Sequence, residues 1–224
     1  ESAQFLAENS VVDYMKKAER RLDEEKERVP LYLLPEILGP LMKCCETALI
    51  AKHASTLRDE FQILLDNDRE ADMARMYKLL ARIPDGLDPL RVRFESHVRQ
   101  AGHLAVEKVA VQGDALDPRA YIDALLEIHT QYAALVHSAF AGESEFVRSL
   151  DNACREYVNR NKVCAKNSNR SPELLAKHAD NVLKRSTKAT EEDDMEKMLN
   201  QVMTIFKYIE DKDVFQKFYS RHLA

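Results

Sequence analysis

The stretch 195-MEKMLNQVMTIFKYI-209 decides the fold class of this sequence. Its apolar residues return at every third or fourth position, and this spacing places them on one face of an α-helix. The stretch that follows, 210-EDKDVFQKFYSRHLA-224, continues the pattern with paired apolar residues at 214–215 and 218–219. Together the two stretches predict two consecutive amphipathic helices.

The composition extends this prediction to the whole chain. Its 224 residues include only 5 Gly and 7 Pro, too few for the turns of a many-stranded sheet. The formal net charge is −5 with acids and bases interspersed, which disfavours a dedicated nucleic-acid or anionic-membrane binder. No apolar run approaches the roughly 18–20 residues of a membrane span, and no signal peptide is recognisable. We expect an all-α intracellular protein that binds neither nucleic acid nor membrane.

Start and stop signals place the helix boundaries. Ser10 is a predicted N-cap, and Asp117 with Pro118 predicts a helix start. The group Ser171-Pro172-Glu173 combines a cap, an early proline and an early acid, the strongest start signal in the chain. Two segments interrupt the periodicity. Residues 30–40 carry three prolines and a glycine and predict a corner, with Pro40 opening the next helix, and residues 161–170 read as a polar linker.

Residues that could support catalysis or metal binding do not form recognisable constellations. Cys44 and Cys45 are adjacent and point about 100° apart on a helix, while Cys154 and Cys164 lack zinc-site spacing, so we expect free thiols. The histidines are scattered, and no Gly-rich loop could cradle a phosphate. The acidic runs 22-LDEEKE-27 and 190-TEEDDMEK-197 fit solvated helix faces better than cation sites. We predict no catalytic residue, no metal and no cofactor.

A weak internal repeat is visible. Sliding the chain so that Phe5 falls on Phe140 also superposes four further apolar positions at helical spacing. These pairs are Val11 on Phe146, Met15 on Leu150, Ala18 on Ala153, and Leu22 on Tyr157. A repeat in a stacked helical array would produce such matches, and so would two unrelated amphipathic helices slid into phase.

Six segments resemble the middle of a cullin, in the order in which cullins carry them. They are 11-VVDYMKKAERRLDEE-25, 59-DEFQILLDND-68, 75-RMYKLLARIPDGLDPL-90, 121-YIDALLEIHTQYAALVHSAF-140, 171-SPELLAKHADNVLKRSTK-188 and 199-LNQVMTIFKYIEDKDVFQKFYSRHLA-224. The likeness is to the class of cullin that pairs with Skp-type adaptors and F-box proteins. It covers nearly the whole chain and is weakest at 30-PLYLLPEILGPLMKCC-45, where the prolines and glycine are unusual.

The resemblance implies an all-α fold of stacked cullin repeats that form an elongated stalk, followed by the first helices of a C-terminal four-helix bundle. It implies the end of the second repeat at 1–30, the third repeat at 31–165, and the truncated start of the bundle at 166–224. The sequence is then expected to be a piece of a longer protein. The family's adaptor-binding repeat would precede Glu1, and its RING-binding strands and modified lysine would follow Ala224.

The function implied by the resemblance is a non-catalytic scaffold of a cullin–RING ubiquitin ligase of the SCF type, holding the substrate-receptor and RING/E2 modules at a fixed separation. The implied partners are a Skp-type adaptor with an F-box protein, a RING-box protein, a ubiquitin-like modifier and a cullin exchange factor. The implied location is the cytoplasm and nucleus. Nine residues are expected to form the family motif and pack the stalk–bundle junction: Val202, Phe206, Tyr208, Ile209, Asp213, Val214, Phe215, Phe218 and Tyr219.

Two other classes stay open on the residues alone. A helical-repeat adaptor or tethering subunit of another intracellular complex would show the same amphipathic helices. It would have no reason to contain 208-YIEDKDVFQKFY-219. An all-α enzyme would need a pocket with paired titratable groups.

Overall fold

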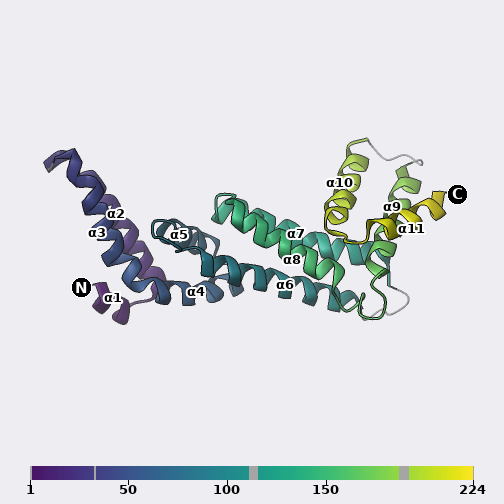
Figure 1. The fold of residues 1–224 in the computed structure, drawn as a ribbon, viewed down its shortest axis with the longest axis horizontal. Coiled ribbons are helices and arrows are strands. Elements are labelled where there is room, and N and C mark those ends of the chain that lie inside the picture. The colour runs from purple at the N-terminus through teal and green to yellow at the C-terminus, as the bar shows by residue number, and fades with distance from the viewer. Residues whose placement is uncertain (1, 33, 111–115, 187–191, 224) are drawn as a thin grey trace. The chain divides into compact units, whose positions relative to one another are not determined.

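The computed structural model describes residues 2–32, 34–110, 116–186 and 192–223 of the chain. These residues form α-helices, two short 3₁₀ turns (Pro35–Ile37 and Ala51–His53) and connecting loops, with no strand among them, so the all-α prediction is confirmed (Figure 1). The helices are α1 (Ser2–Glu8), α2 (Val11–Tyr32), α3 (Leu38–Leu49), α4 (Ala54–Asp66), α5 (Glu70–Leu80), α6 (Asp88–Ala110), α7 (Pro118–Ala139), α8 (Ser144–Asn159), α9 (Arg170–Ser186), α10 (Glu192–Tyr208) and α11 (Lys212–Leu223).

Two predicted helix starts are confirmed by their caps. The Ser10 hydroxyl accepts the backbone N–H of Asp13 at 3.1 Å at the start of α2. The Asp117 carboxylate accepts the N–H of Arg119 at 3.1 Å, and Pro118 is the first residue of α7. The helix end expected at Val111, and Thr190 and Glu191 of the acidic run 190–197, lie outside the described residues.

The proline-rich corner differs from its prediction. Helix α2 continues through Pro30 to Tyr32, and α3 begins at Leu38, so Pro40 is its third residue. Pro30 lies in the last turn of α2 and has no N–H to donate to the Lys26 carbonyl. Lys26 is exposed, so water can bond this carbonyl instead. Pro40 is tolerated because an N–H in the first turn has no partner within the helix.

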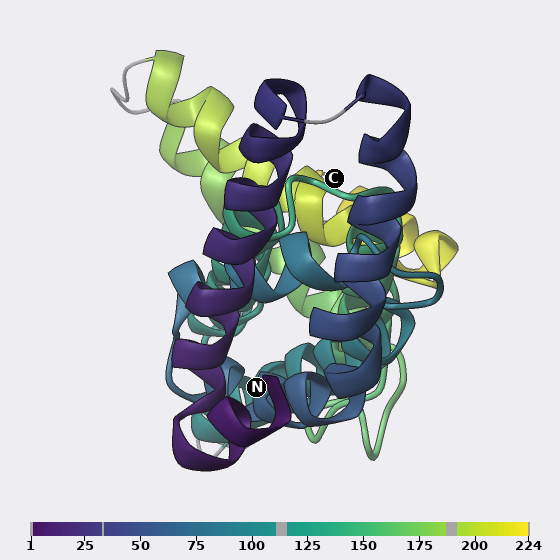
Figure 2. The same cartoon turned by 90° about the vertical axis from the view of Figure 1, so that its left-hand side faces the viewer.

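The chain divides into two compact units, residues 1–94 with 135–146 and residues 95–134 with 147–224. In the first unit α2 packs along α3 and against α5, and Figures 1 and 2 show α2 and α3 side by side. The apolar centre of this unit is an aromatic cluster. The Phe140 and Phe146 rings stack at 4.1 Å, and the Phe94 ring meets both edge-on. Phe61 and Tyr77 complete the cluster.

The second unit contains a close approach between α6 and α8. A Cβ atom at Gly102 would lie 2.3 Å from ring atoms of Tyr157, which is fully buried. Only a glycine therefore lets the α6 backbone pass this ring. Near the C-terminus α9 packs against both α10 and α11 (Figure 1).

The segment predicted as a linker is a packed set of turns. Asn161 and Cys164 are buried, and the Asn161 side chain accepts the backbone N–H groups of Val163 and Cys164. Helix α9 begins at Arg170, so Ser171 lies inside it and is not its cap. The Ser171 side chain is fully buried and bonds the Tyr121 hydroxyl at 3.0 Å. The segment is therefore packed into the fold at Asn161 and Cys164, and its residues 165–168 are exposed. The predicted repeat boundaries at 30/31 and 165/166 stay predictions.

Candidate functional site

The residues expected to pack the junction lie in the C-terminal half of α10, at Ile209 just after it, and in the first two turns of α11. Val202, Tyr208 and Ile209 are buried, with 5%, 2% and 2% of their surface exposed. Ile205, on the same side of the chain, is also buried. In this unit α10 packs against α9. The apolar spacing in the sequence thus marks the buried face of α10.

Aromatic rings connect α10 with α11. The Phe206 and Phe215 ring centroids are 4.9 Å apart, and the Phe215 and Tyr219 rings stack at 5.8 Å. The Lys212 ammonium lies 5.5 Å from the Phe206 ring centroid. These rings are half-buried, and each such aromatic pair adds roughly 0.5–1.5 kcal/mol beyond its buried area.

Three further predicted residues have simpler places. Val214 and Phe218 are half-buried on α11, and Asp213 is exposed in its first turn. A carboxylate at that position interacts favourably with the N-terminal end of the helix dipole. The role of all nine residues as a family motif stays a prediction.

A hydrogen-bonded network surrounds the Tyr208 hydroxyl. This hydroxyl donates to Asp151 Oδ1 at 2.7 Å, and its oxygen lies 3.1 Å from His129 Nε2. Because the single hydroxyl proton is directed at Asp151, the His129 nitrogen is the donor of the second bond. Lys207 Nζ bonds both Asp151 oxygens, at 2.9 and 3.0 Å. Tyr208 therefore joins α10 to α8 and α7.

The environment fixes the protonation states in this network. Burial, followed by the hydrogen bond to Asp151, raises the pKa of the Tyr208 hydroxyl, so it stays a donor at neutral pH. Burial and then the nearby Lys207 ammonium lower the pKa of His129. At neutral pH the His129 ring is therefore uncharged, in the tautomer that carries its proton on Nε2.

Asn159 binds the end of α10 to the end of α8. Its amide nitrogen donates to the Tyr208 carbonyl at 2.9 Å, and its amide oxygen accepts the Glu210 N–H at 3.1 Å. The Tyr208 carbonyl is one of the C-terminal groups that a helix leaves without an internal donor. Next to it Arg160 bonds both Glu210 oxygens, at 2.9 and 3.0 Å.

A second buried polar cluster joins α7, α8 and α9. Asn161 Nδ2 donates to the Tyr121 hydroxyl at 2.9 Å and to the Tyr157 carbonyl at 2.8 Å. The Tyr121 hydroxyl also meets the Ser171 hydroxyl. These groups are occupied with one another, which suits them to holding helices in register.

The sequence analysis missed Asp151, Asn159 and His129, which make the polar half of the site. Asp151 had one weak signal: it lies three residues before the buried Cys154, at the edge of the apolar face of α8. Asn159 and His129 had none, because their partners are 49 and 79 residues away in the chain.

The remaining candidate ligands stay apart. Within the described residues no group of three His, Cys, Asp or Glu side chains could hold a metal ion. The four cysteines are free thiols, and burial raises the pKa of Cys154 to about 11. Among the described helices, none has the length and apolarity needed to cross a bilayer.

The described residues thus form an all-helical protein in which the polar groups around Tyr208 and Asn161 join helices to one another. Comparison with known proteins gives the family: residues 1–224 match the cullin alpha solenoid domain, and the chain belongs to the cullin family.

Three relatives support this assignment. The chain is 51% identical to cullin-1 of Dictyostelium discoideum over 226 residues, covering 100% of this chain and 29% of that protein. It is 48% identical to cullin-1 of Schizosaccharomyces pombe, covering 100% and 30%. It is 41% identical to cullin-1 of Caenorhabditis elegans, covering 99% and 29%. The chain therefore spans about 30% of the length of the curated relatives it matches.

Proposed function

We propose that this chain is a rigid, non-catalytic scaffold segment of a cullin–RING ubiquitin ligase of the SCF type. The observation that carries the proposal is the identity of 51% and 48% to two cullin-1 proteins over the whole chain. The polar contacts of Tyr208 and Asn159, which join α10 to α8, support it because they fix these helices in place. A scaffold needs that property, since the distance between the modules it carries sets their effective concentration.

The partners follow from the same proposal. In the protein at its natural length they are a Skp-type adaptor with an F-box protein, a RING-box protein, a ubiquitin-like modifier and a cullin exchange factor. The proposed location is the cytoplasm and nucleus, which imaging of the tagged protein at its natural length tests. Exclusion from both compartments would overturn that part.

The partner test is a pull-down with the natural-length protein as bait, read by mass spectrometry. We expect a RING-box protein and a Skp-type adaptor in one complex. A well-folded bait that recovers neither would overturn the proposal.

The rigidity test separates binding from transfer. The double variant Tyr208→Phe/Asn159→Ala loosens the junction and leaves the partner sites untouched. We expect both partners to remain bound while ubiquitin transfer to a receptor-bound substrate falls, and the control Lys16→Ala, on the exposed face of α2, to transfer normally. Normal transfer by the loosened variant would overturn the fixed-separation part of the proposal.

A further inference from the structure

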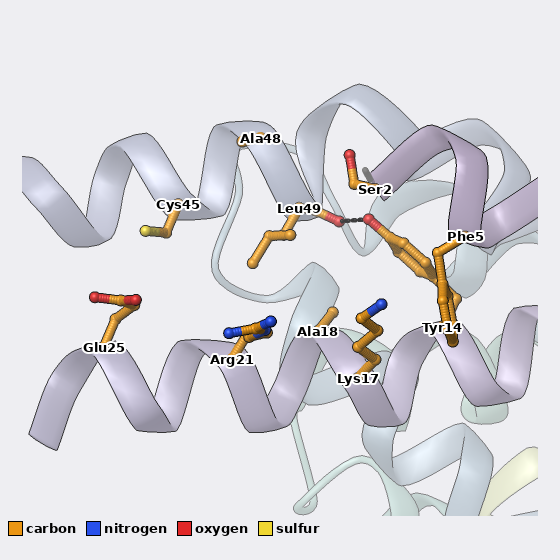
Figure 3. Close-up of a pocket in the computed structure, with 10 residues that line it drawn as sticks. All are labelled: Ser2, Phe5, Tyr14, Lys17, Ala18, Arg21, Glu25, Cys45, Ala48 and Leu49. Carbon is orange, nitrogen blue, oxygen red and sulfur yellow. Dashed lines mark hydrogen bonds between the residues drawn. The ribbon is translucent and has the colours of Figure 1, made fainter. Parts of the chain in front are cut away.

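A groove in the first unit is separate from the junction. It lies where α1, α2 and α3 meet, and its volume is about 310 Å³, at the lower end of the range for small-molecule sites. Figure 3 shows its lining side chains, with α2 forming one wall and α3 the other.

Small residues create the space. Ala18 on α2 and Ala48 on α3 line the groove from its two walls, and the Phe5 ring of α1 lines one end. At that end the Tyr14 hydroxyl donates to the Leu49 carbonyl at 2.8 Å and joins the two walls. The larger part of the lining surface is therefore suited to an apolar body.

Two cations enter the same groove. Figure 3 shows Lys17 and Arg21 reaching from α2 into the gap toward α3. The Lys17 ammonium lies 3.6 Å from the Phe5 ring centroid, and the carboxylates of the described residues make no ion pair with it. Within the described part of the chain, the ion pair of Arg21 is a long, exposed contact of 3.5 Å with Glu24.

Among the described residues of the lining, Glu25 carries the one carboxylate. It faces Cys45 across the groove in Figure 3, and it pairs with Arg28 at 3.1 Å. The described lining thus carries two cations, Lys17 and Arg21, and one carboxylate, beside an apolar wall. Anionic groups held by such cations form the stronger class of hydrogen bonds.

We propose that this groove binds a small amphipathic anion, with one carboxylate or sulfonate on an aromatic or branched apolar body. Lys17 and Arg21 hold the acid, and Phe5, Ala18 and Ala48 contact the apolar body. The proposal does not depend on the proposed scaffold function.

The chain carries a reporter and its control side by side. Cys45 lines the groove, whereas its neighbour Cys44 is exposed and lies outside it. The probe is 8-anilino-1-naphthalenesulfonate, a sulfonate on fused aromatic rings. Alkylation rates are measured on the natural-length protein, for Cys45 in a Cys44→Ser background and for Cys44 in a Cys45→Ser background. We expect saturating probe to slow the alkylation of Cys45 by about tenfold and to leave the alkylation rate of Cys44 unchanged.

Each thiol is compared only with itself, with and without probe, because burial and nearby Glu25 raise the pKa of Cys45. If the probe does not slow the alkylation of Cys45, the proposal is overturned. This holds whether another part of the protein covers the groove or the probe binds elsewhere. Equal slowing of Cys44 and Cys45 would also overturn it.

Charge and volume variants complete the test. Lys17→Glu should weaken probe binding by about tenfold, and the control Lys16→Glu, on the exposed face, should not. Ala48→Phe fills the groove and should weaken binding without a charge change.

N-phenyl-1-naphthylamine, which has the same rings and no sulfonate, should bind at least about tenfold more weakly than the probe. Equal effects of the two lysine variants, or equal binding of the two compounds, would contradict the proposed anion site. Pull-down of the RING-box protein reports on the scaffold proposal independently.

Discussion

The aromatic cluster of the first unit and the Tyr208 network of the second hold helices together by different means. Phe61, Phe94, Phe140 and Phe146 are fully buried and interact through ring faces and edges, which have no fixed partner atom. Tyr208 is also buried, but its hydroxyl needs particular atoms, those of Asp151 and His129, at hydrogen-bond distance. The first region gains stability from volume and area, and the second gains a defined geometry.

The largest expected effect is in the aromatic cluster. Phe140→Ala removes a ring that touches four others and should lower the free energy of unfolding by about 3–5 kcal/mol. Urea denaturation followed by circular dichroism measures it. Phe140→Leu, which keeps most of the volume, is the matched control and should cost less. A loss equal for both variants would contradict a role for the rings themselves.

The next effect is in the Tyr208 network. Tyr208→Phe keeps the ring but leaves Asp151 Oδ1 and His129 Nε2 each without one partner, so stability should fall by about 1–3 kcal/mol. The control is Tyr32→Phe, at a side chain that is 78% exposed, which should change stability by less than about 0.5 kcal/mol. If both variants behave alike, the hydroxyl contributes nothing and the two regions do not differ in kind.

A smaller effect is expected at the helix end. Asn159→Ala removes two hydrogen bonds to the end of α10 and should cost about 1 kcal/mol. The sharper measurement is hydrogen exchange, in which the Glu210 amide should exchange faster. Asn152→Ala, which removes an exposed contact of 3.3 Å to Glu95, should leave that amide unchanged. An unchanged Glu210 amide in Asn159→Ala would show that the contact is not formed in solution.

The smallest effect depends on pH. The folded-state pKa of His129 lies below its unfolded value of about 6.5, so protonation favours the unfolded chain. The stability that the neutral ring provides is complete above about pH 6.5 and is lost as the pH falls below it. His129→Gln retains an N–H donor without the titration, so its stability should fall less than that of the parent protein between about pH 7 and pH 5. Parallel curves for the two proteins in urea titrations at each pH would exclude this role.

The same contrast explains what the sequence could predict. Apolar periodicity predicted that Val202 and Ile205 of α10, and Ile209 just after it, share one buried face, because burial leaves a regular pattern in the sequence. Caps at Ser10 and Asp117 were predictable because the bonds that they make are local.

The polar contacts left no comparable trace. Asn159 bonds a carbonyl 49 residues away, and Ser171 lies inside α9 with its hydroxyl on a tyrosine 50 residues earlier. The helix-start prediction at Ser171 used only neighbouring residues, whereas its hydroxyl bonds a residue that is distant in the chain. Pro30 was predicted to lie in a corner, and α2 continues through it because it falls in an exposed last turn.

The contact between Gly102 and Tyr157 has a consequence for inheritance. A side chain at position 102 would enter space that the Tyr157 ring fills. The residue at each of the two positions therefore limits the size of the side chain that evolution can place at the other. Among cullin sequences, an alanine or larger residue at the position of Gly102 should be found together with a smaller residue at that of Tyr157. The two positions should therefore covary although 54 other residues separate them in the chain.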